Sequence, residues 1–216
     1  MRDYPLDFNQ LFNFSLSCPY ESHLKDDPLL TQLNTLKVKL NFPAVTDDVG
    51  SLLGFLVQLI KPEVIFEMGS GYGHSAYWYR EASPFIKNIY LTEKRDDLKE
   101  HFEHLPWPED FYKKLDYFQG DAFEKLKEVA SLDFLLIDGV KADYLEFLKQ
   151  ALPKMNKGSL AFIDNSYWRG SFLDSSVKKQ SAIKIKELHS FLQNESTVKA
   201  IFLPFTDGVT LITKLS

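Results

Sequence analysis

The sequence of 216 residues is poor in cysteine and has no long apolar run. Cys18 is its single cysteine, so no disulfide can form within the chain. No apolar run approaches the ~20 residues that a membrane-spanning helix needs, and the first residues lack the basic start and apolar stretch of a secretory signal. We therefore expect a soluble, cytoplasmic protein that does not bind a membrane.

Positive charge is also scarce. Lys and Arg number 25 against 30 Asp and Glu, which gives a net charge of -5. This balance argues against a general nucleic-acid surface, which usually has a basic face. A small group of lysines could meet RNA but is more typical of a solvated helix face: Lys178, Lys179, Lys184 and Lys186. The five histidines are scattered and suggest no site.

The chain has ample apolar material. It is 44% hydrophobic and 14% aromatic, which is enough to bury a full core. No repeat, low-complexity segment or Pro/Gly/Ser-rich linker marks a boundary between domains. We predict a single domain over 1–216, in which a helical segment over 1–60 packs on a core over 61–216.

Short apolar runs, rich in β-branched and aromatic residues, predict seven strands, near 63–68, 87–92, 116–119, 133–137, 158–163, 197–203 and 208–214. Helix-period segments separate most of them, which indicates an α/β fold with a mostly parallel sheet covered on both faces. The last two runs are joined by residues 204–208, and Asp207-Gly208 suits a tight reversal. A C-terminal antiparallel hairpin is therefore expected.

Helical periodicity is clearest before the first strand. Two apolar stripes are predicted to face the core there: Leu29, Leu30, Leu33, Leu36 and Leu40, then Leu52, Leu53, Leu56, Leu59 and Ile60. Thr46 is a plausible cap at the start of the second of these helices. A further stripe follows the fourth strand, at Tyr144, Phe147, Leu148 and Leu152.

A glycine-rich turn follows the first predicted strand and reads E-x-G-x-G-x-G, from Glu67 through Gly69 and Gly71 to Gly73. Glycine reaches positive φ at little cost and leaves room for a ligand, although such turns also use glycine purely for packing. A dinucleotide-binding turn would place a glycine where His74 stands. Twenty residues after Gly73 the second strand ends in Glu93, an acid that can accept both hydroxyls of a ribose.

Two later predicted strands are each followed by side chains that carry oxygen ligands. These are Asp138 after one strand, and Asp164 and Asn165 after the other. The carboxyl ends of strands in an open α/β sheet meet at one edge, so these side chains should face the glycine turn and one another if their strands are neighbours. No histidine or cysteine joins them, which favours Mg²⁺ or Ca²⁺ over zinc, with Mg²⁺ the best fit and Mn²⁺ possible.

The glycine turn resembles the first motif of class I S-adenosylmethionine-dependent methyltransferases. The later motifs resemble the cation-dependent O-methyltransferases of the catechol and caffeoyl-coenzyme A type, with D-x-x-K-x-x-Y, then D-N, then an aromatic residue before glycine. Here these are Asp138, Lys141 and Tyr144, then Asp164, Asn165, Trp168 and Gly170. The likeness runs from about Leu29 to Lys214. It implies a Rossmann-like methyltransferase fold with extra N-terminal helices.

The resemblance also implies residue roles. Asp138, Asp164 and Asn165 would hold the divalent ion, and Lys141 would take the proton from the accepting hydroxyl, with Asp138 beside it in the catalytic pair. A cation that chelates the acceptor oxygens would favour loss of that proton and disfavour the ammonium form of Lys141. The cofactor would contact Val45, Glu67, Gly69, Gly71, Gly73, Ser75, Glu93, Gly120, Asp121, Ala122 and Asp138.

Simpler alternatives exist for several of these residues. Asp121 and Asp138 can each serve only as a helix cap, Lys141 can be a solvated helix residue, and Val45 and Thr46 can be merely structural. Tyr167 and Trp168 can wall the acceptor pocket or can simply pack beside the sheet.

The resemblance implies an enzyme that methylates a hydroxyl of a small, catechol-like aromatic compound and that forms a homodimer. Alternative functions are methylation of a hydroxylated uridine in tRNA, or a catalytically silent protein that binds the cofactor. A nicotinamide-dependent oxidoreductase is disfavoured by His74 and by the acids at the later strand ends.

Overall fold

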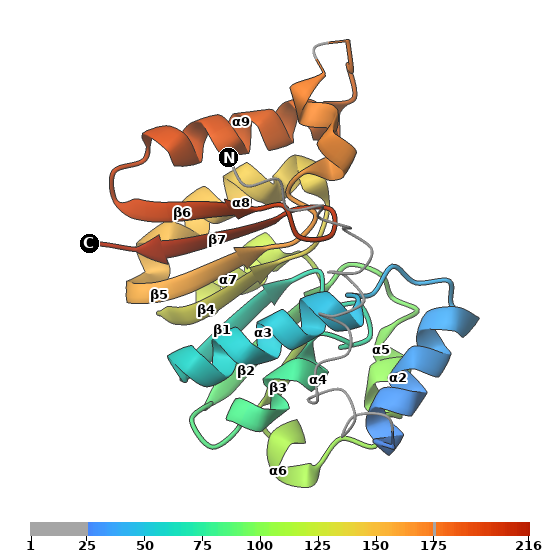
Figure 1. Cartoon of the computed structure of the whole chain (residues 1–216). Helices are drawn as coiled ribbons and strands as arrows, with labels where there is room; N and C mark the ends of the chain where they lie inside the picture. Colours follow the sequence, from blue (N-terminus) through green and yellow to red (C-terminus); the bar gives the residue numbers. More distant parts are fainter. Residues whose placement is uncertain (1–25, 175) are drawn as a thin grey trace, which may run out of the picture.

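The structure, a computed structural model, describes residues 26–174 and 176–216. Cys18 and the start of the predicted N-terminal helical segment lie outside these residues. The described residues form a seven-stranded sheet in the order β3-β2-β1-β4-β5-β7-β6 (Figure 1). The strands are β1 Val64–Met68, β2 Asn88–Glu93, β3 Leu115–Gln119, β4 Leu132–Ile137, β5 Met155–Ile163, β6 Val198–Leu203 and β7 Val209–Lys214.

Strands β1 to β5 pair in parallel, and β7 pairs antiparallel with both β5 and β6. This arrangement confirms the predicted fold class, including the terminal hairpin. The hairpin turns at Thr206 and Gly208, which both have positive φ, where glycine is favoured.

Helices cover both faces of the sheet. The α-helices are α2 Pro28–Lys39, α3 Asp47–Ile60, α4 Ala76–Tyr79, α5 Lys99–Glu103, α6 Glu109–Tyr112, α7 Ala122–Glu128, α8 Tyr144–Ala151 and α9 Gln180–Asn194. Short 3-10 turns are η2 Arg80–Ala82, η3 Lys141–Asp143, η4 Leu152–Lys154 and η5 Trp168–Leu173. Among the described residues, no helix is both long enough and apolar enough to cross a bilayer.

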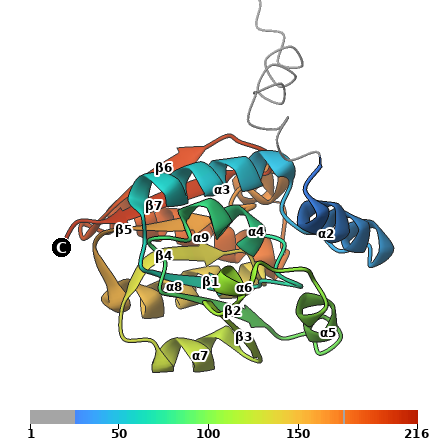
Figure 2. The same ribbon diagram turned by 90° about the horizontal axis from the view of Figure 1, so that it is seen from below.

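The alternation of side chains along the strands divides the core in two. Ile65, Phe134 and Phe162 face a cluster that includes residues of α2 to α6. Phe66, Leu135 and Ile163 face a second cluster built on α7, α8 and α9. Figure 2 shows α3 on one side of the sheet and α7 with α8 on the other.

The N-terminal helices follow the predicted apolar stripes with one exception. Leu29, Leu30 and Leu33 are buried, as is Leu53, but Leu59 is 68% exposed, so its assignment to the core is wrong. The buried face of α3 carries Val49, Gly50, Leu53, Gly54 and Val57, and Leu59 lies on the far side of the helix from their centre. Thr46 does occupy the N-cap position of α3, but its side chain makes no capping hydrogen bond.

Candidate active site

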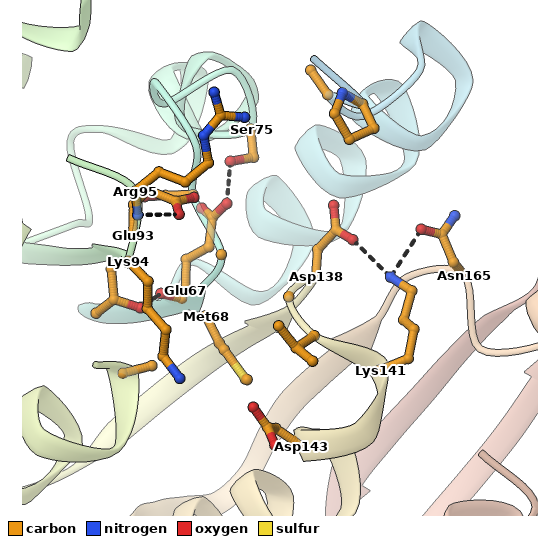
Figure 3. A pocket seen from close by; sticks show the side chains of 18 of the residues that line it. Glu67, Met68, Ser75, Glu93, Lys94, Arg95, Asp138, Lys141, Asp143 and Asn165 are labelled. Carbon is orange, nitrogen blue, oxygen red and sulfur yellow. Dashed lines mark hydrogen bonds and ion pairs between the residues drawn. The ribbon is translucent and has the colours of Figure 1, made fainter. Parts of the chain in front are cut away.

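A cavity of about 720 Å³ opens at the carboxyl ends of the parallel strands. It lies where the strand order reverses, between β1 and β4, which is the place where open α/β sheets bind ligands. Glu67 and Ser75 lie near Glu93 at one side of this cavity, and Asp138, Lys141 and Asn165 lie at the other (Figure 3).

The three glycines of the turn after β1 have positive φ, but each allows a different part of the chain to approach closely. A Cβ on Gly69 would lie 2.3 Å from the backbone oxygen of Asp138, so this glycine lets the first loop approach the end of β4. A Cβ on Gly71 would meet the ring of Phe42, and one on Gly73 would meet Phe102. Gly69 lines the cavity, whereas Gly71 and Gly73 are not among its lining residues.

Glu67 is a buried acid at the floor of the cavity. Its side chain accepts hydrogen bonds from Ser75 Oγ and from Tyr79 Oη, the latter at 3.2 Å. Burial raises the pKa of Glu67 to about 8, and the nearby carboxylate of Asp138 adds to the effect, although the two hydroxyl donors oppose it. A positively charged ligand group beside Glu67 would favour its ionised form.

Glu93 ends β2 and turns back toward the glycine turn. Its carboxylate accepts from the backbone N–H of Gly71 at 3.0 Å and of Arg95 at 2.9 Å. Next to it, Gly120 donates its N–H to the Glu93 carbonyl at 2.8 Å, which joins the ends of β2 and β3. Gly120 and Ala122 line the cavity beside Glu93.

Asp121, between these two residues, points elsewhere. Its Oδ1 accepts from the N–H of Phe123 at 2.9 Å and so caps α7. Its other oxygen lies 3.3 Å from Lys94 Nζ. Asp121 caps α7 and is not among the residues that line the cavity.

Lys141 lies at the opposite side of the cavity and is buried. Its Nζ contacts Asp138 Oδ1 at 3.3 Å, Tyr144 Oη at 2.5 Å and Asn165 Oδ1 at 3.1 Å. These partners come from the end of β4, the start of α8 and the end of β5. Two of the oxygens predicted to hold a metal ion therefore converge on a single cationic position (Figure 3).

Asp164 lies just behind this group and does not line the cavity. It is 3% exposed, and its Oδ1 accepts from the N–H of Asn165 at 2.8 Å. Burial, together with the negative charge of the nearby Asp138, raises the pKa of Asp164 to about 7. Nowhere in the described part of the chain do three His, Cys, Asp or Glu side chains gather as a metal site; the predicted set has two carboxylates and an amide.

A short segment after α2 covers the cavity. Phe42, Pro43, Ala44 and Val45 all line it. Lys37 Nζ donates to the carbonyl of Val45 at 3.1 Å, and the guanidinium of Arg95 lies 5.6 Å from the centre of the Phe42 ring. Thr46 is not among the lining residues.

Of the predicted site residues, the cavity brings together these ten: Val45, Glu67, Gly69, Ser75, Glu93, Gly120, Ala122, Asp138, Lys141 and Asn165. Trp168 also lines it, but Tyr167 packs against Gly208 and Phe172 instead. Sequence reasoning missed Lys94 and Arg95, whose place directly after Glu93 was the available signal. It also missed Ser181, for which the sequence offers no signal.

Comparison with known proteins places the chain in a family. The family model described as O-methyltransferase matches residues 20–215. The chain belongs to the O-methyltransferase family. This confirms the predicted family and enzyme class.

Individual relatives are more distant. Caffeoyl-CoA O-methyltransferase 1 of Nicotiana tabacum is 27% identical over 198 residues, which covers 84% of this chain and 82% of the tobacco enzyme. The O-methyltransferase TomG of Streptomyces achromogenes, solved in complex with SAM, is 21% identical with a TM-score of 0.79 and covers 91% of this chain and 95% of that one. The O-methyltransferase from Bacillus cereus, solved with SAH, is 20% identical with a TM-score of 0.78, covering 90% and 96%. The last two comparisons support the fold.

Proposed function

We propose that this O-methyltransferase moves the methyl group of S-adenosylmethionine to a hydroxyl of a small catechol-like aromatic compound, with help from a divalent cation. The observation that carries the proposal is the convergence of Asp138 Oδ1 and Asn165 Oδ1 on Lys141 Nζ, within a cavity whose other side holds Glu67 and Glu93. One side suits a nucleoside with a charged amino-acid tail. The other suits an acidic hydroxyl.

The donor would lie between the glycine turn and the end of β3. Glu93 carries two carboxylate oxygens that can accept from ribose hydroxyls, as acids at this place do in nucleotide-binding folds. Gly120 and Ala122 would border the adenine, while Gly69, Glu67 and Ser75 would face the methionine end. The TomG structure holds SAM and the Bacillus cereus structure holds SAH, which supports this choice of donor.

The donor set at the other side fits a hard divalent cation. Two oxygens already converge on the ammonium of Lys141, and the negative charge of Asp138 adds to the cost of ionising the buried Asp164, which a divalent cation would offset. Asp138, Asp164 and Asn165 would hold the ion, and oxygen donors of this kind favour Mg²⁺, with Mn²⁺ or Ca²⁺ as alternatives. When bound, the ion would favour ionisation of the acceptor hydroxyl.

Lys141 would then act as the base. In this step Lys141 would be the neutral amine, whose lone pair takes the proton of the acceptor hydroxyl. The hydroxyl oxygen would form its new bond to the methyl carbon as the bond from that carbon to the donor sulfur breaks. Holding the two reactants in line would supply much of the rate. Trp168, whose ring centre lies 5.9 Å from Lys141 Nζ, would border the aromatic acceptor.

The direct test is methyl transfer from labelled S-adenosylmethionine to a panel of catechols and to tRNA that carries hydroxyuridine, with and without a chelator. We expect transfer to catechols that is lost with chelator and regained with Mg²⁺. Transfer to tRNA alone would favour the second function. Cofactor binding with no transfer to any acceptor would favour a silent protein.

Two variants separate the proposed roles. Lys141→Ala should keep its affinity for S-adenosylmethionine but lose turnover by about 100-fold or more, since a positioned base contributes about that much. Asp164→Ala should first raise the Mg²⁺ concentration needed for half-maximal rate. Lys149→Ala, an exposed lysine of α8, is the matched control and should not change the rate. Equal rates in all three variants would refute these roles.

A further inference from the structure

We propose that Tyr144 positions Lys141: its phenolic oxygen is the anchor that keeps Nζ in place while a divalent cation is held by the oxygens of Asp138 and Asn165. This inference rests on the proposed function. It adds a positioning residue to the reaction, because Tyr144 acts through Lys141 and does not line the cavity.

The first support is the set of partners around Lys141. An ammonium has three N–H donors, and here each has an acceptor: Asp138 Oδ1, Tyr144 Oη and Asn165 Oδ1. At 2.5 Å, the contact with Tyr144 is shorter than the other two, at 3.3 and 3.1 Å. Lys141 is therefore fixed by three separate segments of the chain.

The second support is the direction of the hydrogen bonds at Tyr144. Its hydroxyl donates its single proton to the backbone carbonyl of Asp164 at 3.2 Å. Oη can then only accept from Lys141.

The third support is competition for the other two acceptors. The Asp138 and Asn165 oxygens are the ones that the proposed cation would need. A cation held there would repel the ammonium and take these acceptors from it. Of the three acceptors around Lys141 Nζ, Tyr144 Oη is the one that a cation would leave to Lys141.

The anchor itself is rigid. Tyr144 is 0% exposed and begins α8, where it packs in the same buried cluster as Phe147, Leu148 and Ile185. The aromatic ring of Tyr144 is also close to Lys141, with 4.8 Å between the ring centre and Nζ. Small displacements of a reacting group are costly, so a fixed anchor has a direct effect on rate.

The test is Tyr144→Phe, which keeps the ring and removes only the anchor oxygen. Loss of a hydrogen bond to a charged group predicts a drop in kcat of about 10- to 100-fold. The affinity for S-adenosylmethionine, measured by calorimetry, should not change. A crystal structure of the variant should show Lys141 Nζ displaced.

The matched control is Tyr77→Phe on α4. Tyr77 is also a buried tyrosine whose hydroxyl accepts from a cationic side chain, Arg80 Nη2 at 3.3 Å, but it lies outside the cavity lining. Loss of the Tyr77 hydroxyl should lower the stability of the protein and leave kcat unchanged. A similar fall in kcat for both variants would mean general damage and would overturn the proposal.

A double-mutant cycle with Lys141→Ala gives the decisive comparison. If Tyr144 acts through Lys141, Tyr144→Phe should have no further effect in the Lys141→Ala background. If the losses of kcat in the two single variants add in the double variant, the role of Tyr144 is wrong. It is also wrong if Tyr144→Phe keeps the wild-type kcat while Lys141→Ala is slow. Either result would leave the proposed function standing. A Lys141→Ala variant with full activity would instead overturn the proposed base.

Discussion

Glu67 is a buried carboxyl group that the fold places beside two other acids, and burial is the main reason why its pKa rises to about 8. The unfolded value is near 4.5. At neutral pH the folded protein without ligand therefore favours the neutral acid. The group lowers stability progressively as the pH rises from the unfolded value toward the folded one.

Glu67→Gln should remove this dependence. As the pH rises from about 5 to about 7, the unfolding free energy of the native protein should fall relative to that of Glu67→Gln, with a slope that approaches about 1.4 kcal/mol per pH unit and declines again toward pH 8. Urea unfolding of both proteins at several pH values measures it. The cationic S-adenosylmethionine favours the ionised form of Glu67. The affinity of the native protein for S-adenosylmethionine should therefore rise as the pH approaches 8, whereas that of Glu67→Gln should not. Parallel pH profiles for the two proteins would contradict the assignment.

Gly69 is required for a close approach and not only for its φ of +93°. Its Cβ would lie 2.3 Å from the Asp138 oxygen, whereas a Cβ on Gly158, at a φ of +79°, would have nothing within 4 Å. Gly158→Ala is thus a matched control that carries backbone strain without a clash.

We expect Gly158→Ala to cost about 1 to 2 kcal/mol of unfolding free energy, the usual cost of a left-handed alanine. Gly69→Ala should cost roughly 1 to 3 kcal/mol more, because the loop must move away from β4. It should also weaken binding of S-adenosylmethionine, while Gly158→Ala should not. Denaturant unfolding and calorimetry measure both quantities. Equal costs for the two variants would mean that the close approach does not matter.

At the scale of elements, the terminal hairpin holds the loop that follows β5. That loop has positive φ at Asn165, Trp168 and Arg169, a conformation that costs non-glycine residues free energy. Asp207 keeps it in place: Oδ1 accepts from the N–H of Arg169, and its carbonyl accepts from the N–H of Tyr167 at 2.9 Å. The hairpin between β6 and β7 thereby fixes Asn165 and Trp168 at the cavity.

Asp207→Ala should release this loop. We expect the KM for the acceptor to rise by about 10-fold, from the loss of one charge-assisted hydrogen bond, while the affinity for S-adenosylmethionine stays the same. Asp207→Asn keeps an acceptor oxygen and should remain close to the native enzyme. Steady-state kinetics of both variants measure this, and an unchanged KM in Asp207→Ala would count against the role of the hairpin.

Local patterns predicted the elements well and their cross-contacts poorly. The strands agree with prediction to within about three residues at each end, because the apolar runs and the Asp207-Gly208 reversal are local signals. The hydrogen bond between the Arg169 N–H and Asp207 joins residues 38 positions apart, and no local sequence pattern in either segment predicts it. The close approach of Phe42 to Gly71 is likewise absent from the local pattern, since the two residues lie far apart in sequence.

At the scale of the whole molecule, we propose one domain. Leu33 of α2 and Leu53 of α3 belong to the same buried cluster as Ile65 and Phe134 of the sheet, and Arg80 pairs with Asp27 at 2.7 Å. The helices before β1 therefore share a core with the strands. The place of the cavity follows from the strand order, which the family resemblance implied, whereas the covering segment at Phe42 depends on how these helices pack.

The central claim is that one cavity brings a nucleoside-bearing donor to the group formed by Asp138, Lys141 and Asn165. A crystal structure with S-adenosylhomocysteine and Mg²⁺ tests it most directly. The account predicts the ribose on Glu93, the sulfur facing Lys141, and the ion on Asp138, Asp164 and Asn165. A nucleoside in another cleft, or an ion bound away from these three side chains, would contradict it.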